Sequence, residues 1–116
     1  MKEPILHALA HTYDVEERET IAETDTVRVH TLLLTAGQSV PWHRHSAVDD
    51  TFVCLSGSMV MLTDGDRTET ALQPGEMFTV SAGVGHSVLP VTGAGTKFLL
   101  IQATGRHDYI PLPNPA

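Results

Sequence analysis

The chain is poor in cysteine, aromatic residues and basic residues, and each shortage excludes a class of protein. Its 116 residues include a single cysteine, Cys54, so no disulfide can form within the chain. Aromatic residues make up only 5% of the sequence, so a core must be built chiefly from aliphatic side chains. The 7 Lys and Arg against 14 Asp and Glu give a net charge of −7, which argues against binding to nucleic acid or anionic membranes.

Long hydrophobic runs are also missing. No apolar stretch reaches the length of a transmembrane helix, and no apolar region follows Lys2 as it would in a signal peptide. We therefore expect a cytoplasmic protein. The length suits one domain, and the hydrophobic content of 41% allows a core without disulfides or a structural metal.

Short β-strand patterns separated by turn residues fill the chain from residue 27 onwards. The dipeptide Asp64-Gly65 between two such patterns is a strong hairpin signal. Short strands at this regular spacing are typical of an all-β sandwich or barrel. We expect strands at residues 27–35, 40–45, 51–55, 58–63, 67–72, 77–80, 86–91 and 97–103.

The two ends of the chain differ from this middle part. Residues 1–26 form an acidic N-terminal arm, which we expect to pack on the barrel or on a dimer partner, and residues 14–22 could form a helical turn. Residues 27–103 make up the barrel. Residues 104–116 form a Pro-rich C-terminal tail, and its prolines exclude a central strand there.

Three histidines and one aspartate carry the strongest functional signal. His43 and His45 alternate along one expected strand, so their imidazoles point to the same side. Asp50 follows after a turn at residues 46–49, and His86 comes from a distant segment. Three imidazole nitrogens and a carboxylate suit a divalent transition metal such as iron, manganese, nickel or zinc. The sequence therefore predicts a metal site and favours an enzyme.

These residues fall into two motifs that resemble those of the cupin superfamily. The pattern G-x5-H-x-H-x4-D-x6-G over residues 37–57 resembles the first cupin motif, and G-x5-S-x-G-x2-H over residues 75–86 resembles the second. The resemblance covers roughly residues 27–103. It implies a small single-domain (mono-cupin) protein with a double-stranded β-helix, a jelly-roll barrel of two antiparallel sheets that encloses the metal. It also implies a homodimer, because cupins of this size often form one.

Three positions depart from the family pattern. The usual glutamate of the first motif is Asp50, the usual proline of the second is Ser81, and the usual asparagine after the last histidine is Pro90. Aspartate is one methylene shorter than glutamate, so its carboxylate lies roughly 1.5 Å further back. Asp50 therefore binds the metal after a backbone shift, binds it through water, or lies behind the three histidines. Asp49 fits the same place less well.

The resemblance implies a metal-dependent enzyme that acts on a small organic molecule. We expect an Fe(II)-type dioxygenase or oxidoreductase, in which Asp50 completes the metal site or acts as a base through a bound water. A Lewis-acid metal would instead support an isomerase or a lyase, and a cupin that only binds a small molecule is a third alternative. No Lys or Arg falls at a position that we expect to face inward, which favours a neutral or weakly acidic substrate.

Several other polar residues match no motif. We interpret Cys54 as a small buried hydrophobic residue. The alternation of the last strand does not fix whether Gln102 faces inward. The remaining histidines are interpreted as structural or exposed, although His30 lies on a strand that should border the barrel mouth or the dimer edge; they are His7, His11, His30 and His107.

Overall fold

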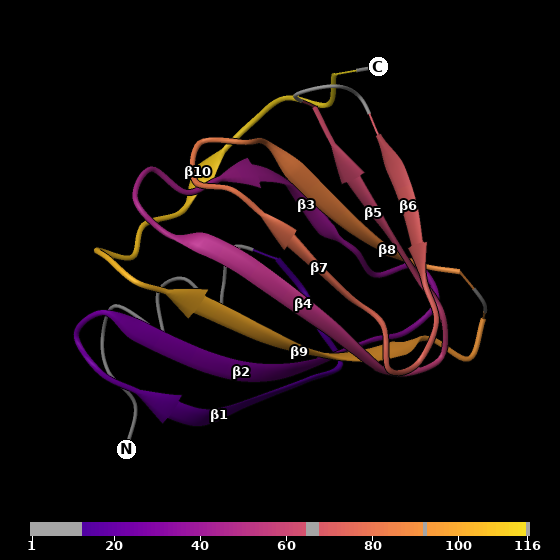
Figure 1. Cartoon of the computed structure of the whole chain (residues 1–116). Helices are drawn as coiled ribbons and strands as arrows, with labels where there is room; N and C mark the ends of the chain where they lie inside the picture. Colours follow the sequence, from indigo (N-terminus) through magenta and orange to yellow (C-terminus); the bar gives the residue numbers. More distant parts are fainter. Residues whose placement is uncertain (1–12, 65–67, 92, 116) are drawn as a thin grey trace.

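The computed structural model describes residues 13–64, 68–91 and 93–115, and it places these residues in strands and loops. The strands form two five-stranded sheets that face each other as the walls of a barrel (Figure 1). Every strand pair is antiparallel. Among the described residues, no helix is both long and apolar enough to cross a membrane.

The chain passes repeatedly from one sheet to the other, as the predicted double-stranded β-helix requires. One sheet has the order β1-β2-β9-β4-β7 and the other β10-β3-β8-β5-β6. The predicted fold is confirmed, and the eight expected strands are present with no end shifted by more than two residues. The bounds are β1 (Glu17–Glu23), β2 (Val27–Leu34), β3 (Val40–Arg44), β4 (Asp49–Ser56), β5 (Met59–Thr63), β6 (Glu69–Leu72), β7 (Met77–Val80), β8 (His86–Pro90), β9 (Thr96–Ala103) and β10 (Ile110–Pro111).

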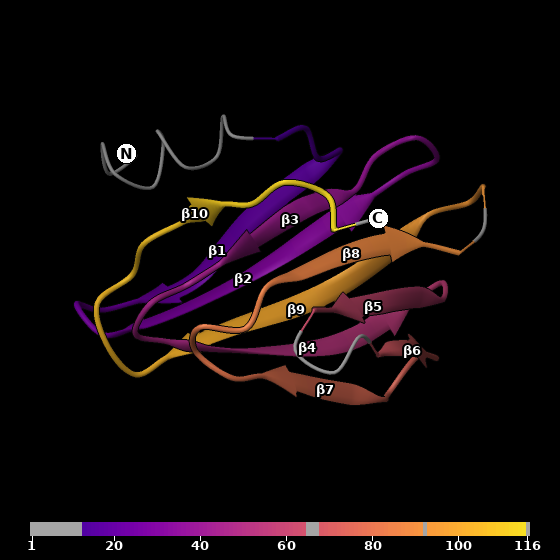
Figure 2. The same ribbon diagram turned by 90° about the horizontal axis from the view of Figure 1, so that it is seen from above.

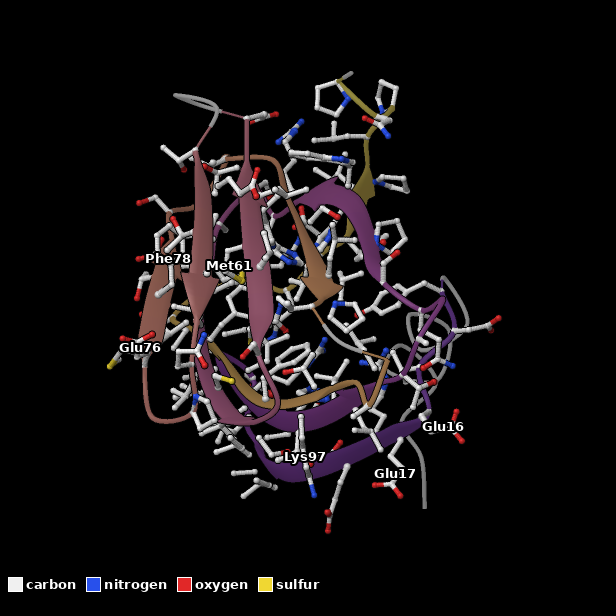
Figure 3. The ribbon with its side chains drawn as sticks, turned by 90° about the vertical axis from the view of Figure 1, so that its right-hand side faces the viewer. Glu16, Glu17, Met61, Glu76, Phe78 and Lys97 are labelled. Atoms are coloured by element: carbon white, nitrogen blue, oxygen red, sulfur yellow. The ribbon has the colours of Figure 1, made fainter. Side chains whose placement is uncertain are left out.

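Alternation along the strands builds the core. In β2, β5 and β9, buried residues alternate with half-buried ones over the full strand, because successive side chains point to opposite faces of a sheet. The inward side chains of both sheets meet in one cluster, and Cys54 is buried within it as predicted. Figure 3 shows side chains filling the space between the sheets, while Glu17 and Lys97 point away from it. The cluster comprises Leu32, Leu34, Val40, Phe52, Cys54, Met59, Met61, Leu72, Val80, Val88, Phe98 and Leu100.

The inner face of each sheet is apolar at one end and polar at the other. Across β2, β9 and β4, the directly paired residues Leu32, Phe98 and Cys54 form what we call the apolar row. Four residues away along β2, a second set of paired residues forms the polar row, which consists of Arg28, Gln102 and Asp50. The opposite sheet repeats this division, because His43, His86 and Thr63 pair in one row and Val40, Val88 and Met61 in the next.

The helical turn considered for residues 14–22 is wrong, because the structure has strand β1 there. β1 pairs with the free edge of β2, with Glu17 opposite Leu33 and Thr20 opposite His30. Its sequence shows no clear apolar alternation, since an edge strand that is mostly exposed needs none. Residues 17–23 of the N-terminal arm thus extend one sheet of the barrel, and its first 12 residues lie outside the described part of the chain.

The C-terminal segment returns to the barrel after β9. In Figure 2 it loops around one end of the barrel before it reaches β10, which pairs with the outer edge of β3. Ile110 lies opposite Arg44, and Pro111 lies opposite His43. Proline is tolerated in an edge strand of this kind, so the expectation that the tail forms no central strand is confirmed.

Candidate metal centre

The three predicted histidines come from two neighbouring strands. His43 lies in β3 and pairs across the sheet with His86, the first residue of β8, while His45 follows the end of β3. A bulge in β3 between Val40 and His43 allows Val40 and His43 both to face inward, although they are three positions apart. All three imidazoles are at most 5% exposed. The fold therefore brings together rings that are far apart in the sequence.

Backbone carbonyl groups orient all three rings. In each ring, Nδ1 lies within hydrogen-bond distance of a carbonyl oxygen, which can only accept. In the neutral ring, Nδ1 must therefore carry the proton, which leaves a lone pair on Nε2. The Nδ1–O distances are 2.8 Å from His43 to Pro41, 2.5 Å from His45 to Asp108 and 3.0 Å from His86 to Val84.

The Nε2 atoms converge on one point together with a carboxylate oxygen. His43 Nε2 lies 3.2 Å from His45 Nε2. Asp50 Oδ2 lies 3.0 Å from the Nε2 atoms of both His45 and His86. Metal bonds of about 2.1 Å at right angles separate neighbouring ligands by about 3.0 Å. These three separations therefore match adjacent corners of a single coordination shell.

The arrangement requires a positive charge at its centre. Two Nε2 lone pairs that face each other at 3.2 Å repel unless a cation lies between them. Burial lowers the pKa of His45, but the hydrogen bond and the charge of Asp50 outweigh it, so the pKa of this ring is raised and a proton can take that place. A divalent metal fits the same donor set better, because it can use all four groups at once.

Asp50 reaches the histidines although its side chain is shorter than the glutamate of the family pattern. It faces inward from the second residue of β4, after a loop that resets the alternation as predicted. Gln102 Nε2 donates to its other oxygen, Oδ1, at 3.0 Å. Burial alone would raise the pKa of Asp50, but the hydrogen bonds with His45 and His86 outweigh burial and lower it. The carboxylate is therefore ionised at neutral pH.

Asp49 does not belong to this cluster. Its side chain is exposed on the outer face of β4, where Oδ1 accepts a hydrogen bond of 2.9 Å from the backbone N–H of Ala82.

The charge on His43 is also suppressed. Burial, followed by the nearby His86, lowers the pKa of His43 to about 3. A neutral His43 can offer its lone pair to a metal without first losing a proton.

Three further residues of the site were not predicted. Gln102 is the cross-strand partner of Asp50, and its orientation was left open by the sequence. Asp108 contributes the carbonyl that holds His45, and the ring of Tyr109 stacks on His43 with 4.4 Å between centroids. Both belong to the tail, where a backbone carbonyl and a single tyrosine leave no recognisable sequence signal. The alternation of buried residues in β9 could have indicated Gln102.

A cavity of about 40 Å³ is lined by three of the four candidate ligands, His43, His45 and Asp50, and it corrects one expectation. The sequence predicts no inward basic residue, but Arg28 of β2 and Arg18 of β1 both line this cavity. Arg28 shares the inward face of β2 with Leu32 and Leu34, so the alternation of that strand could have revealed it. His30, interpreted as structural or exposed, also lines the cavity and is only 2% exposed.

The comparisons with solved structures agree with this fold. An uncharacterised conserved protein with a double-stranded β-helix domain from Klebsiella pneumoniae matches with a TM-score of 0.74 and 20% identity over 84% of each chain. The DMSP lyase DddQ from Ruegeria pomeroyi matches with a TM-score of 0.72 and 17% identity, over 89% of this chain and 54% of that one. An oxalate oxidase matches with a TM-score of 0.68 and 15% identity, over 76% and 47%.

At these identities the likeness establishes the fold alone, and a lyase and an oxidase share it. A comparison with curated protein sequences finds no match. The model of the family described as "Cupin domain" matches residues 30–102, which include all four candidate ligands and most of the barrel. The match covers more than half of the sequence and agrees with the two motifs and the two facing sheets. The chain therefore belongs to the cupin family.

Proposed function

We propose that this protein is a metal-dependent cupin enzyme that oxidises a small organic molecule. His43, His45, Asp50 and His86 hold the metal, and iron in the Fe(II) state is the metal we expect. The observation that carries this proposal is the convergence of three Nε2 atoms whose Nδ1 atoms are all fixed by backbone carbonyls. Four protein ligands leave two positions of an octahedral ion open, as a catalytic site requires.

The metal would supply redox and dioxygen chemistry, and the chain supplies the rest. Apolar side chains, among them Phe52 and Leu100, line the cavity beside the cluster and limit the access of water. Asp50 faces this cavity, so if it held the metal through a water molecule instead of directly, it could accept a proton through that water. Gln102 keeps that carboxylate in place through its hydrogen bond to Oδ1.

An isomerase or a lyase is the second candidate, and the position of Asp50 beside the metal site favours it. Both reactions need a base next to a metal that polarises a carbonyl or enolate. An ionised carboxylate within 3.0 Å of two imidazole nitrogens offers such a base. The two candidates differ in whether dioxygen is consumed.

Metal analysis and oxygen uptake test the proposal. We expect about one metal ion per chain in the purified protein, and loss of this ion in His45→Ala. His107→Ala is the matched control, because its ring lies outside the four-residue cluster. Protein reconstituted separately with Fe(II), Mn(II), Ni(II) and Zn(II) is then assayed over a panel of small organic substrates.

The outcomes separate the alternatives. Product formation with equivalent oxygen uptake supports the oxidoreductase, whereas product formation without oxygen uptake assigns the isomerase or lyase. Metal binding without turnover of any substrate favours a cupin that only binds its ligand. Full activity of the metal-free protein, or metal retention by His45→Ala, would overturn the proposal.

A further inference from the structure

A second polar cluster lines the same cavity, and several of its buried atoms have no hydrogen bond among the described residues. Both ring nitrogens of His30 are buried without a hydrogen bond, and so are Arg28 Nε, Arg18 Nη2 and the neighbouring Glu23 Oε1. Buried polar groups normally have partners, since leaving one unsatisfied costs about 1–3 kcal/mol. His30, Arg28 and Arg18 all line this cavity, which indicates that a ligand supplies the missing hydrogen-bond partners.

The strand register places Arg28 and His30 of this cluster two strands away from Asp50, on the same face of the sheet. Arg28 pairs with Gln102, and Gln102 pairs with Asp50, so the polar row runs directly from one cluster to the other. Two strand spacings separate the Cα atoms of Arg28 and Asp50 by roughly 10 Å. His30 lies in the adjacent row, opposite Leu100. A short molecule in the cavity can therefore contact both the candidate metal ligands and the cluster of Arg18, Arg28 and His30.

The charges at this end of the cavity favour a single negative charge on the ligand. Glu23 Oε2 lies 3.5 Å from Arg28 Nε and offsets one of the two guanidinium groups. The guanidinium of Arg18 lies over the ring of Tyr13. His30 is neutral, because burial and then the charges of Arg18 and Arg28, with a smaller effect of His107, lower its pKa to about 4. One positive charge remains for the ligand.

We propose that Arg18, Arg28 and His30 bind the carboxylate of a small organic acid whose other end reaches the metal centre. The second half of this statement rests on the proposed function. Guanidinium groups match a carboxylate in shape and charge, and a neutral imidazole can donate one further hydrogen bond. The cavity of about 40 Å³ has room for only a few water-sized groups, which favours a short acid.

Calorimetric titration of the metal-loaded full chain with matched ligand pairs tests this inference. The probes are acetate, butanoate and 4-oxopentanoate, each compared with its neutral amide, which has nearly the same shape. We expect at least one acid to bind about tenfold or more tightly than its amide, as charged hydrogen bonds to a buried site predict. Inorganic phosphate is titrated as a separate arm.

Variants of the two arginines show which side chains cause the preference for the acid over its amide. Arg28→Gln should lose most of the preference for the acid, and Arg18→Gln should lose part of it. Arg18 lies on the edge strand β1, so its variant keeps the test valid if Arg28→Gln does not fold. Arg106→Gln is the matched control, because it removes one positive charge from an exposed position and should retain the preference.

The outcomes distinguish this inference from the proposed function. Equal affinities of every acid and its amide, an undiminished preference in both arginine variants, or tighter binding of phosphate than of any acid would overturn the inference while metal content is normal. A protein that binds no metal but still prefers acids would overturn the proposed function and support the carboxylate site alone.

Discussion

The two ends of the barrel interior share the strands β2, β9 and β4 but use them differently. In the apolar row, Phe98 and its neighbours are almost fully buried and need only shape and volume to fit. In the polar row, Arg28, Gln102 and Asp50 are buried as well, yet each must find a partner for its polar atoms. Asp50 and Gln102 bind each other, whereas Arg28 retains an unsatisfied nitrogen.

This difference shows where stability and chemistry reside in the molecule. The apolar end contributes hydrophobic burial of about 1.5–3 kcal/mol for each large side chain. The polar end contributes much less, because desolvation of its groups opposes folding unless a ligand or a metal compensates. Variants at the apolar end should therefore change mainly the free energy of unfolding, whereas variants at the polar end should change mainly ligand binding.

The largest expected effect is on stability, at the apolar end. Phe98→Ala removes a side chain that is 0% exposed and should lower the free energy of unfolding by about 3–5 kcal/mol. Urea denaturation of the metal-free protein measures this change. A loss below about 1 kcal/mol would contradict the assignment of the apolar row as the main core.

A smaller effect is expected in the pH dependence of stability, at the polar end. The pKa of His30 is about 4 in the folded protein, against 6.5 for an ordinary histidine, so between these values the unfolded chain binds more protons. Stability from this ring is fully present above pH 6.5 and falls as the pH drops, by up to about 1.4 kcal/mol per pH unit.

His30→Leu removes this titration and fits the apolar neighbours Leu100 and Phe52 in its row. Its unfolding free energy in the metal-free form should therefore fall less steeply than that of the wild type between pH 6.5 and 4. Chemical denaturation at several pH values measures both slopes. Parallel profiles for the two proteins would mean that His30 is not held neutral.

The smallest effect is expected for the residue that connects the two clusters. Gln102→Leu removes the hydrogen bond to Asp50 Oδ1 but keeps the side-chain volume similar. Loss of such a supporting bond typically weakens metal binding by about 10–100-fold. Competition with a chelator measures the affinity. An unchanged affinity together with unchanged stability would show that Gln102 does not position the carboxylate.

The sequence predicted the barrel and the four candidate ligands because both depend on local patterns. Alternation fixed the strands from β2 to β9, and the spacing of His43, His45 and Asp50 after a turn is readable without a fold. β1 was missed, since it is stabilised by pairing with β2 and carries no clear apolar stripe. The prediction of a pocket without basic residues failed partly for the same reason, because Arg18 lies on that strand.

The tail could not be assigned a role for a different reason. His45 and Asp108 are separated by 63 positions, and the contact uses a backbone oxygen that every residue possesses. The pairing of β10 with the edge of β3 and the hydrogen bond from the backbone N–H of Ser46 to Asp108 Oδ1 bring this oxygen to the ring. Long-range backbone contacts of this kind follow from the finished topology, and residue types give no sign of them.

The contact between Asp108 and His45 has a practical consequence for handling this protein. The polypeptide must be intact through β10 for that imidazole to keep its orientation, so a shortened version would retain all four candidate ligands yet bind a metal less tightly. Affinity tags and fusion partners are therefore better attached to the opposite terminus, and proteolytic trimming of the last residues should be checked before any ion content is interpreted.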